Sequence, residues 1–275
     1  MKHISKITAI ALLATLSACE GSDMPIQQAD NHGYISFSAQ PQKTATRANP
    51  YEAYDPTRHP ATMGTFGYYD MPKRYASAAN TIFNNETATY NVATYGWDTA
   101  TKKRWTEYTK ASSFDFFAYM PYTGGATLLR TANNTYTLSF PFAMSDGGNP
   151  VPVIYDTKAA PIICAVPSSK GAITDSNGGG TVSLKFDQTL TGYKLLFMLG
   201  TKMNAIRHFR IKSVTLSGSF STSCTISRSY VWNTTSKSWS ASAITWSDIK
   251  RQSFVETPFP IVYKGYGSAG YDDNT

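Results

Sequence analysis

The segment Tyr34-Ile35-Ser36-Phe37-Ser38-Ala39 alternates apolar and polar side chains. Successive side chains of a strand point to opposite faces, so this alternation predicts a short strand with Ile35, Phe37 and Ala39 on one buried face. Similar segments recur roughly every ten residues, as they do in sandwiches and barrels, and none sustains helical periodicity. The sequence therefore predicts an all-β protein. Further strand candidates include 65–69, 114–120, 136–140, 182–186, 193–199, 224–232, 244–246 and 259–263.

The composition agrees with a pleated, aromatic-rich fold. The 275 residues include 18 Tyr and 14 Phe, and 16% are charged, against roughly 25% in average soluble domains. Aromatic and β-branched side chains pack well on sheets, and low charge argues against intrinsic disorder. The formal charge is +7, but the basic residues are scattered. We interpret the densest run, Lys102–Arg104, as a solvated hairpin tip and expect no nucleic-acid partner.

The first residues are typical of an export signal. Lys2 and Lys6 precede an apolar stretch over 7–16, which is shorter than the roughly 20 residues that a membrane-spanning helix needs. Leu16-Ser17-Ala18-Cys19 resembles the bacterial lipobox. This resemblance implies that residues 1–18 are a lipoprotein signal peptide, and that an acylated Cys19 anchors the chain in outer-membrane lipid.

The rest of the chain divides at changes of composition. Residues 19–33 are polar and predict a flexible tether. The Gly-rich stretch 174–180 is the best candidate for a linker. We therefore expect an N-terminal β-sandwich domain over 34–175 and a C-terminal β-sandwich domain over 181–275.

No catalytic motif is present, and we expect neither an enzyme nor a bound metal or cofactor. The chain lacks a Ser/His/Asp spacing, an HExxH motif and a Gly-rich phosphate loop. A pair of carboxylates for glycoside hydrolysis stays open from sequence alone. The absence of CxxC argues against a zinc ribbon, and for Cys164 and Cys224 we favour two buried free thiols over a disulfide.

Two tryptophans are candidates for stacking on sugar rings. We expect Asn91–Trp97 and Arg104–Tyr108 to form a hairpin with Asp98–Lys103 as its turn, which places Trp97 and Trp105 near the tip. Exposed aromatic rings there would suit a host or bacterial surface glycan. The competing interpretation is that both rings belong to the core.

Taken together, the motifs resemble those of fimbrillins, the subunits of type V pili in Bacteroidales. The resemblance spans about 160 residues, starting from the lipobox. Gln188 stands where a His is expected, and the C-terminal half matches less well. The motifs that carry the resemblance are Thr46-Arg47-Ala48, Phe66-Gly67-Tyr68-Tyr69, Trp105, Phe116–Tyr122, Ile154-Tyr155-Asp156 and Val182–Phe186.

The resemblance implies two tandem transthyretin-like β-sandwich domains and a pilus at the cell surface. An Arg-specific protease would cut between Arg47 and Ala48 and release the first strand, with Tyr34, Ile35, Phe37 and Ala39. A strand from another pilus subunit would then fill the vacated groove. Shaft, tip and anchor roles all stay open, as does the alternative of a tethered glycan-binding lipoprotein that does not polymerise.

Overall fold

The computed structural model describes residues 33–42, 51–71, 80–143, 160–173, 179–190 and 216–256, with backbone only at 216, 220 and 252–256. Their regular secondary structure is almost all β-strand, which confirms the all-β prediction, with a 3-10 helix at Trp105–Tyr108. The strands are β1 (Ser36–Pro41), β2 (Thr62–Tyr69), β3 (Thr81–Asn91), β4 (Gly96–Thr99), β5 (Ser113–Met120), β6 (Thr127–Ala132), β7 (Thr135–Ala143), β8 (Ile162–Cys164), β9 (Ser168–Gly171), β10 (Thr181–Gln188), β11 (Leu216–Asn233), β12 (Ser238–Ala241) and β13 (Thr245–Glu256).

The first sheet closes on itself as a barrel. Its strand order is β2-β3-β4-β1-β10-β8-β5-β9, and β5 also pairs with β2. The ring therefore runs through β2, β3, β4, β1, β10, β8 and β5, with β9 attached to β5. Among the described pairings, β1 with β10 is parallel and the others are antiparallel. Closure leaves few open strand edges.

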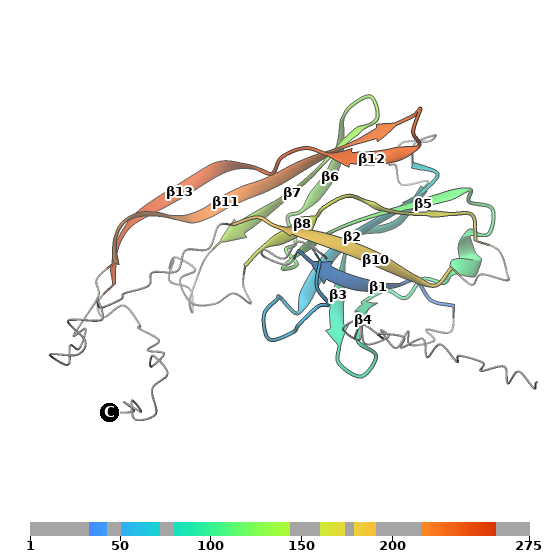
Figure 1. The fold of residues 1–275 in the computed structure, drawn as a ribbon, viewed down its shortest axis with the longest axis horizontal. Helices are drawn as coiled ribbons and strands as arrows, with labels where there is room; N and C mark the ends of the chain where they lie inside the picture. Colours follow the sequence, from blue (N-terminus) through green and yellow to red (C-terminus); the bar gives the residue numbers. More distant parts are fainter. Residues whose placement is uncertain are drawn as a thin grey trace, which may run out of the picture.

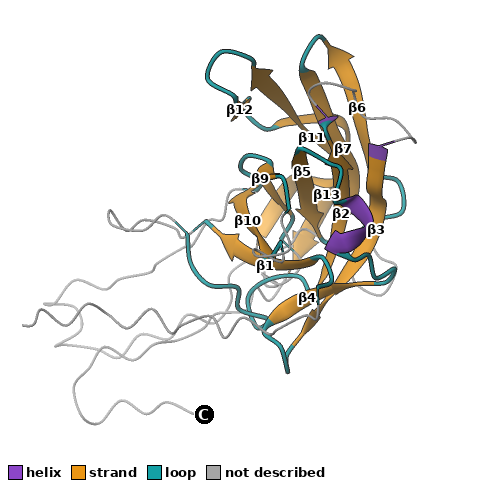
Figure 2. Cartoon of the chain, turned by 90° about the vertical axis from the view of Figure 1, so that its right-hand side faces the viewer, coloured by secondary structure: helices purple, strands orange, loops and turns teal. Residues whose placement is uncertain are grey.

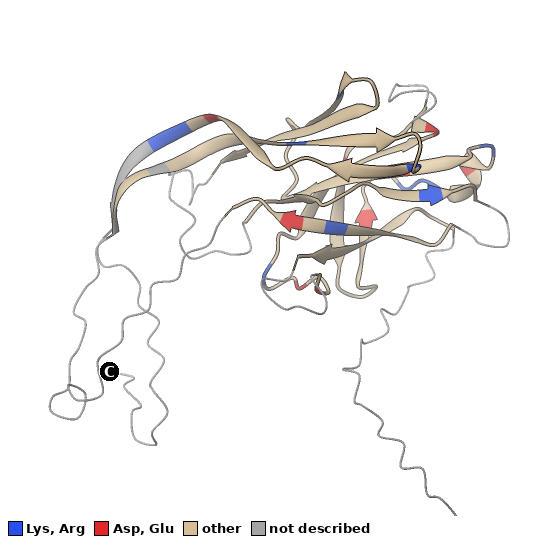
Figure 3. Cartoon of the chain, turned by 45° about the horizontal axis from the view of Figure 1, so that its top comes forward, with Lys and Arg blue, Asp and Glu red and all other residues tan. Residues whose placement is uncertain are grey.

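The second sheet covers one side of the barrel. Its order is β12-β11-β7-β6, and β13 also pairs with β11. Figure 2 shows β6, β7, β11 and β12 above the barrel strands, with β1 and β4 on the opposite side. The hairpin of β11 and β13 extends past the barrel at the left of Figure 1. Lys and Arg residues are spread over several different elements (Figure 3).

Strand β5 is buried on both faces because it lies between the two layers. One face points into the barrel, where Phe116 contacts Phe37 edge-on with ring centroids 5.6 Å apart. The other face meets the second sheet: Tyr119 stacks on Phe140 at 4.4 Å and Phe117 contacts Tyr230 at 5.4 Å. The aromatic side chains of β5 thus join barrel and sheet into one core.

The strand pairings cross the expected domain boundary. β10, from the expected second domain, pairs with β1 and β8, while β7, from the expected first domain, pairs with β11. Of the expected linker, Gly179 and Gly180 are described, and both have positive φ. The Trp105 indole donates a hydrogen bond to the Gly180 carbonyl at 3.1 Å. These two glycines allow a left-handed backbone conformation and close packing against Trp105, and they do not act as a flexible linker.

The predicted position of the hairpin turn, Asp98–Lys103, is wrong. β3 ends at Asn91 and β4 begins at Gly96, so 92–95 form the turn. The Asn91 side chain accepts a hydrogen bond from the Ala93 amide at 3.0 Å, and Tyr95 has φ of 51°. Asn side chains favour such turns over strands. The residues expected as the second hairpin strand form the 3-10 helix instead.

We predict that Gly179→Ala destabilises the protein. A Cβ at Gly179 would lie 2.4 Å from the Trp105 ring, and φ is +73°. Overpacking and a left-handed alanine together should lower the free energy of unfolding by about 2–4 kcal/mol. Urea titration measures the change. Gly171→Ala is the control, because nothing lies within 4 Å of a Cβ there. Equal effects of the two substitutions would contradict the packing role of Gly179.

Asp115 of β5 is a buried carboxylate between the layers. Its side chain is 2% exposed, and its Oδ1 accepts hydrogen bonds from Ser169 and from the Trp239 indole at 2.8 Å. Its Oδ2 has no hydrogen-bond partner among the described residues. Burial raises the pKa of Asp115, and the nearby Asp70 raises that pKa further. The ionised form is therefore disfavoured in the folded state.

We predict that Asp115→Asn removes a pH dependence of stability. Since the pKa is raised on folding, the folded state binds more protons than the unfolded state above pH ~4, and the free energy of unfolding falls as pH rises through the folded pKa. Urea titrations from acid to neutral pH should show this fall in the wild type and lose it in the variant. Asp248→Asn, at an exposed position, is the control. Identical pH profiles of wild type and Asp115→Asn would contradict the prediction.

Candidate functional site

Strand β1 occupies a slot between β4 and β10, where it completes the barrel ring (Figure 1). Its pairing with β10 is a parallel ladder from Ser36 opposite Thr181 to Pro41 opposite Phe186. Its pairing with β4 is short and antiparallel, at Phe37 opposite Trp97. Without β1, the facing edges of β4 and β10 would expose unpaired backbone groups to solvent.

The side chains of β1 confirm the predicted alternation. Ile35, Phe37 and Ala39 are buried; at the alternate positions Ser38 and Gln40 are half-buried and Ser36 is buried. Phe37 is fully enclosed and makes edge-on contacts with Phe83 at 5.8 Å and Phe116 at 5.6 Å. The strand therefore contributes an apolar plug to the barrel interior. Its bounds, Ser36–Pro41, lie about two residues later than the expected strand.

The N-terminal end of β1 is held by the basic run. The Arg104 guanidinium donates a hydrogen bond to the Tyr34 hydroxyl at 2.9 Å and lies 4.8 Å from the centre of its ring. The ammonium of Lys102 lies 5.7 Å from the same ring. The Ile35 amide donates to the Lys103 carbonyl at 2.8 Å. Lys102–Arg104 thus cover the entry of β1 and do not form a hairpin tip.

The C-terminal end of β1 adjoins the point where the chain is next described. Gln42 forms a β-bridge with Tyr51, and the Glu52 amide donates to the Pro41 carbonyl at 2.9 Å. The Gln42 amide donates to the Phe186 carbonyl at 2.7 Å. Gln42 and Tyr51, the described residues on either side of segment 43–50, therefore lie side by side. A cut within this segment would leave β1 attached to the barrel by noncovalent contacts alone.

Several expected site residues lie outside the described ranges. These are Cys19, Arg47 and Ala48. Within the described ranges, no helix is long and apolar enough to cross a membrane. The same ranges contain no group of three or more His, Cys, Asp or Glu side chains that could hold a metal ion.

Trp97 and Trp105 are core residues, so the proposal that they stack on sugar rings is wrong. Each is 1% exposed. Trp97 is the cross-strand neighbour of Phe37 and contacts the Tyr54 ring at 4.9 Å. Trp105 packs edge-on against Phe114 at 5.2 Å and lies against Gly179. The barrel interior needs large side chains, and tryptophan supplies them.

Both described cysteines are free and buried, which confirms the preferred sequence interpretation. The Cys164 thiol donates to the Tyr230 hydroxyl at 2.9 Å, and that hydroxyl donates to the Cys164 carbonyl at 2.7 Å. Burial raises the pKa of Cys164 to about 11. The thiol is therefore unreactive at neutral pH, and its contact links β8 to β11.

Sequence reasoning missed the neighbours of β1. The alternation of Val182, Leu184 and Phe186 predicts a strand, but it does not reveal that this strand runs parallel to β1. The contact of Arg104 with Tyr34 was also missed, and no motif signals it. Pairing partners far apart in the sequence leave no local pattern.

No family model, curated protein or solved structure matches this chain. The geometry of β1 and its slot is therefore the basis for a functional proposal.

We predict that Phe37→Ala destabilises the protein strongly. Truncating a fully buried Phe should lower the free energy of unfolding by about 3–5 kcal/mol. Urea titration measures the loss, and Ser38→Ala, on the half-buried side of the same strand, is the control. A cost at Phe37 no larger than that at Ser38 would show that β1 is not integral to the barrel in solution.

Proposed function

We propose that this protein is a structural or adhesive subunit of a cell-surface pilus that assembles by β-strand exchange. It is exported as a lipoprotein, anchored through Cys19 in outer-membrane lipid, and cut after Arg47 by an Arg-specific protease. The observation that carries the proposal is the position of β1, a buried, ring-closing strand whose C-terminal end adjoins the segment that contains Arg47.

The physics of the slot supports replacement of β1 by another strand. Burial of Ile35 and Phe37 contributes about 3–6 kcal/mol at ~1.5–3 kcal/mol for each side chain. An open slot would lose this free energy and the ladder to β10. A donor strand with apolar side chains at alternate positions would recover both. After the cut, exchange conserves most of the contacts that the slot requires.

In this proposal, cleavage after Arg47 also breaks the covalent connection between the barrel and the lipid anchor. Cys19 and β1 both lie on the N-terminal side of Arg47. Cleavage would therefore break the covalent link between the barrel and its membrane anchor, and the barrel would leave the membrane when β1 is displaced. The partners implied are other pilus subunits, the protease and a host or bacterial surface ligand.

The division into two transthyretin-like units is a finer part of the proposal. Two sheets with separate strand orders support it. Along the chain, β1–β5 and β8–β10 belong to one sheet and β6, β7 and β11–β13 to the other, so each unit would take strands from both sides of residue 175.

We predict that Arg47→Ala blocks processing. An Arg-specific protease should shorten the wild-type protein to Ala48–Thr275, read by N-terminal sequencing, and electron microscopy should show filaments. The variant should keep its anchor and remain unpolymerised. Lys43→Ala lies in the same segment and is the control, because an Arg-specific protease does not cut after Lys.

Wild-type filaments that still contain residues 19–47 would overturn the processing step. A monomer that stays tethered and binds glycans would instead favour the non-polymerising lipoprotein. Mass spectrometry of the cut protein separates the two steps of the proposal. The fragment that ends at Arg47 should stay bound to the barrel until a second subunit displaces it.

A further inference from the structure

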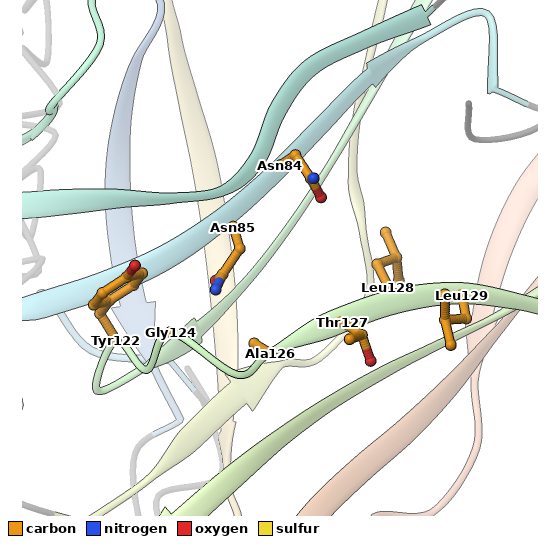
Figure 4. A pocket seen from close by; sticks show the side chains of 8 residues that line it. All are labelled: Asn84, Asn85, Tyr122, Gly124, Ala126, Thr127, Leu128 and Leu129. Atoms are coloured by element: carbon orange, nitrogen blue, oxygen red, sulfur yellow. The ribbon is translucent and has the colours of Figure 1, made fainter. Parts of the chain in front are cut away.

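A hollow of about 490 Å³ lies between β3 and the start of β6 (Figure 4). This volume is within the range of small-molecule sites in proteins, and the hollow is broadly open to solvent. The hollow contains no residue of β1, β4 or β10. Its lining comes from β3, from the loop after β5 and from β6: Asn84, Asn85, Tyr122, Gly124, Ala126, Thr127, Leu128 and Leu129.

One wall of the hollow is fixed by hydrogen bonds. Asn85 has φ of 52° and lies at a register shift between β3 and β2. Its Nδ2 donates to the Thr123 carbonyl at 2.8 Å, and its Oδ1 is 2.7 Å from the Tyr119 hydroxyl. The Thr123 amide donates to the same hydroxyl at 3.0 Å. The wall is therefore preorganised, which lowers the entropic cost of binding.

Other polar groups of the lining are available to a ligand. Asn84 and Thr127 are exposed, and Tyr122 is half-buried. None of these three side chains has a hydrogen-bond partner among the described residues. In Figure 4 the Asn84 and Asn85 side chains come from one strand, opposite the chain that runs from Ala126 to Leu129. The Asn84 amide and the Tyr122 phenol thus border the hollow, whereas the Thr127 and Leu129 side chains point away from Asn84, on the other face of β6 from Leu128 (Figure 4).

The remaining lining is apolar, and the lining contains no Asp, Glu, His, Lys or Arg. Leu129 is 60% exposed beside buried Leu128 and Ala126. A phosphate, a carboxylate or a metal ion would find no charged partner in this lining. A ligand with several neutral hydroxyls and apolar C–H faces would find partners for both.

We propose that this hollow binds a neutral mono- or disaccharide. The Asn84 amide hydrogen-bonds to sugar hydroxyls, and the Tyr122 ring packs against a C–H face of the sugar. Strand β6 is also a sheet edge, but side chains from two layers converge on the hollow. A compact ligand uses both layers, whereas an added peptide strand would use only the backbone of β6.

The test is saturation-transfer NMR on the full-length chain in detergent. The probes are cellobiose, maltose and N,N′-diacetylchitobiose, with 3′-sialyllactose as an acidic comparison. At least one neutral probe should bind. Asn84→Ala and Tyr122→Ala should each weaken its affinity about tenfold, the equivalent of one lost hydrogen bond or ring contact. Asn84 is exposed, so its variant keeps the fold even if Tyr122→Ala does not.

Thr89→Ala and Tyr95→Ala are matched controls, because both residues are exposed and lie outside the lining. They should leave the affinity unchanged. The proposal is overturned if no neutral probe binds at about 10 mM, where a millimolar site would be occupied. The proposal is also overturned if 3′-sialyllactose is the only probe that binds. It is overturned as well if Asn84→Ala leaves the affinity for the neutral probe unchanged. Concentration-dependent shifts confined to β6 amides without sugar binding would indicate strand addition and also overturn it.

Discussion

The parallel pairing of β1 with β10 is the constraint on which the rest of the barrel depends. Antiparallel neighbours can be joined by tight turns, but a parallel pair requires a long connection. Here Ser36 and Thr181, whose hydroxyls lie 3.3 Å apart, are separated by 145 positions. The ring can close only when the two ends of this long intervening segment come together. The apolar face of β1 then seals the interior from which Phe83 and Phe116 contact Phe37.

Strand β5 connects the closed barrel to the second sheet. Its inward side chains pack against β1, and its outward side chains pack against β7 and β11. The ion pair of Arg228 and Asp187, at 2.6 Å, adds a polar link between β11 and β10. Barrel and sheet therefore share one packed core. Replacing the strand in the slot would alter the packing of β5, and β5 contacts the second sheet directly.

Local pattern explains which parts of this fold could be predicted. Alternation located β1, β7 and β10 because period two is visible within a few residues. The hairpin was misplaced because the Asn91 side chain and the left-handed Tyr95 form a turn that composition alone does not show. Trp97 and Trp105 were assigned to a tip that does not exist, since burial depends on pairing. The hollow beside Asn84 is lined by residues of two layers that are far apart in the sequence, so no single segment predicts it.

The separation of β1 from β10 also has a kinetic consequence. Closing a loop of 145 residues costs about 4 kcal/mol in chain entropy by the logarithmic length term. Contacts of such high contact order form late. A chain that crosses a membrane N-terminus first would thus present β1 long before its partner emerges. The ladder between β1 and β10 can therefore form only after residues 181–186 have emerged.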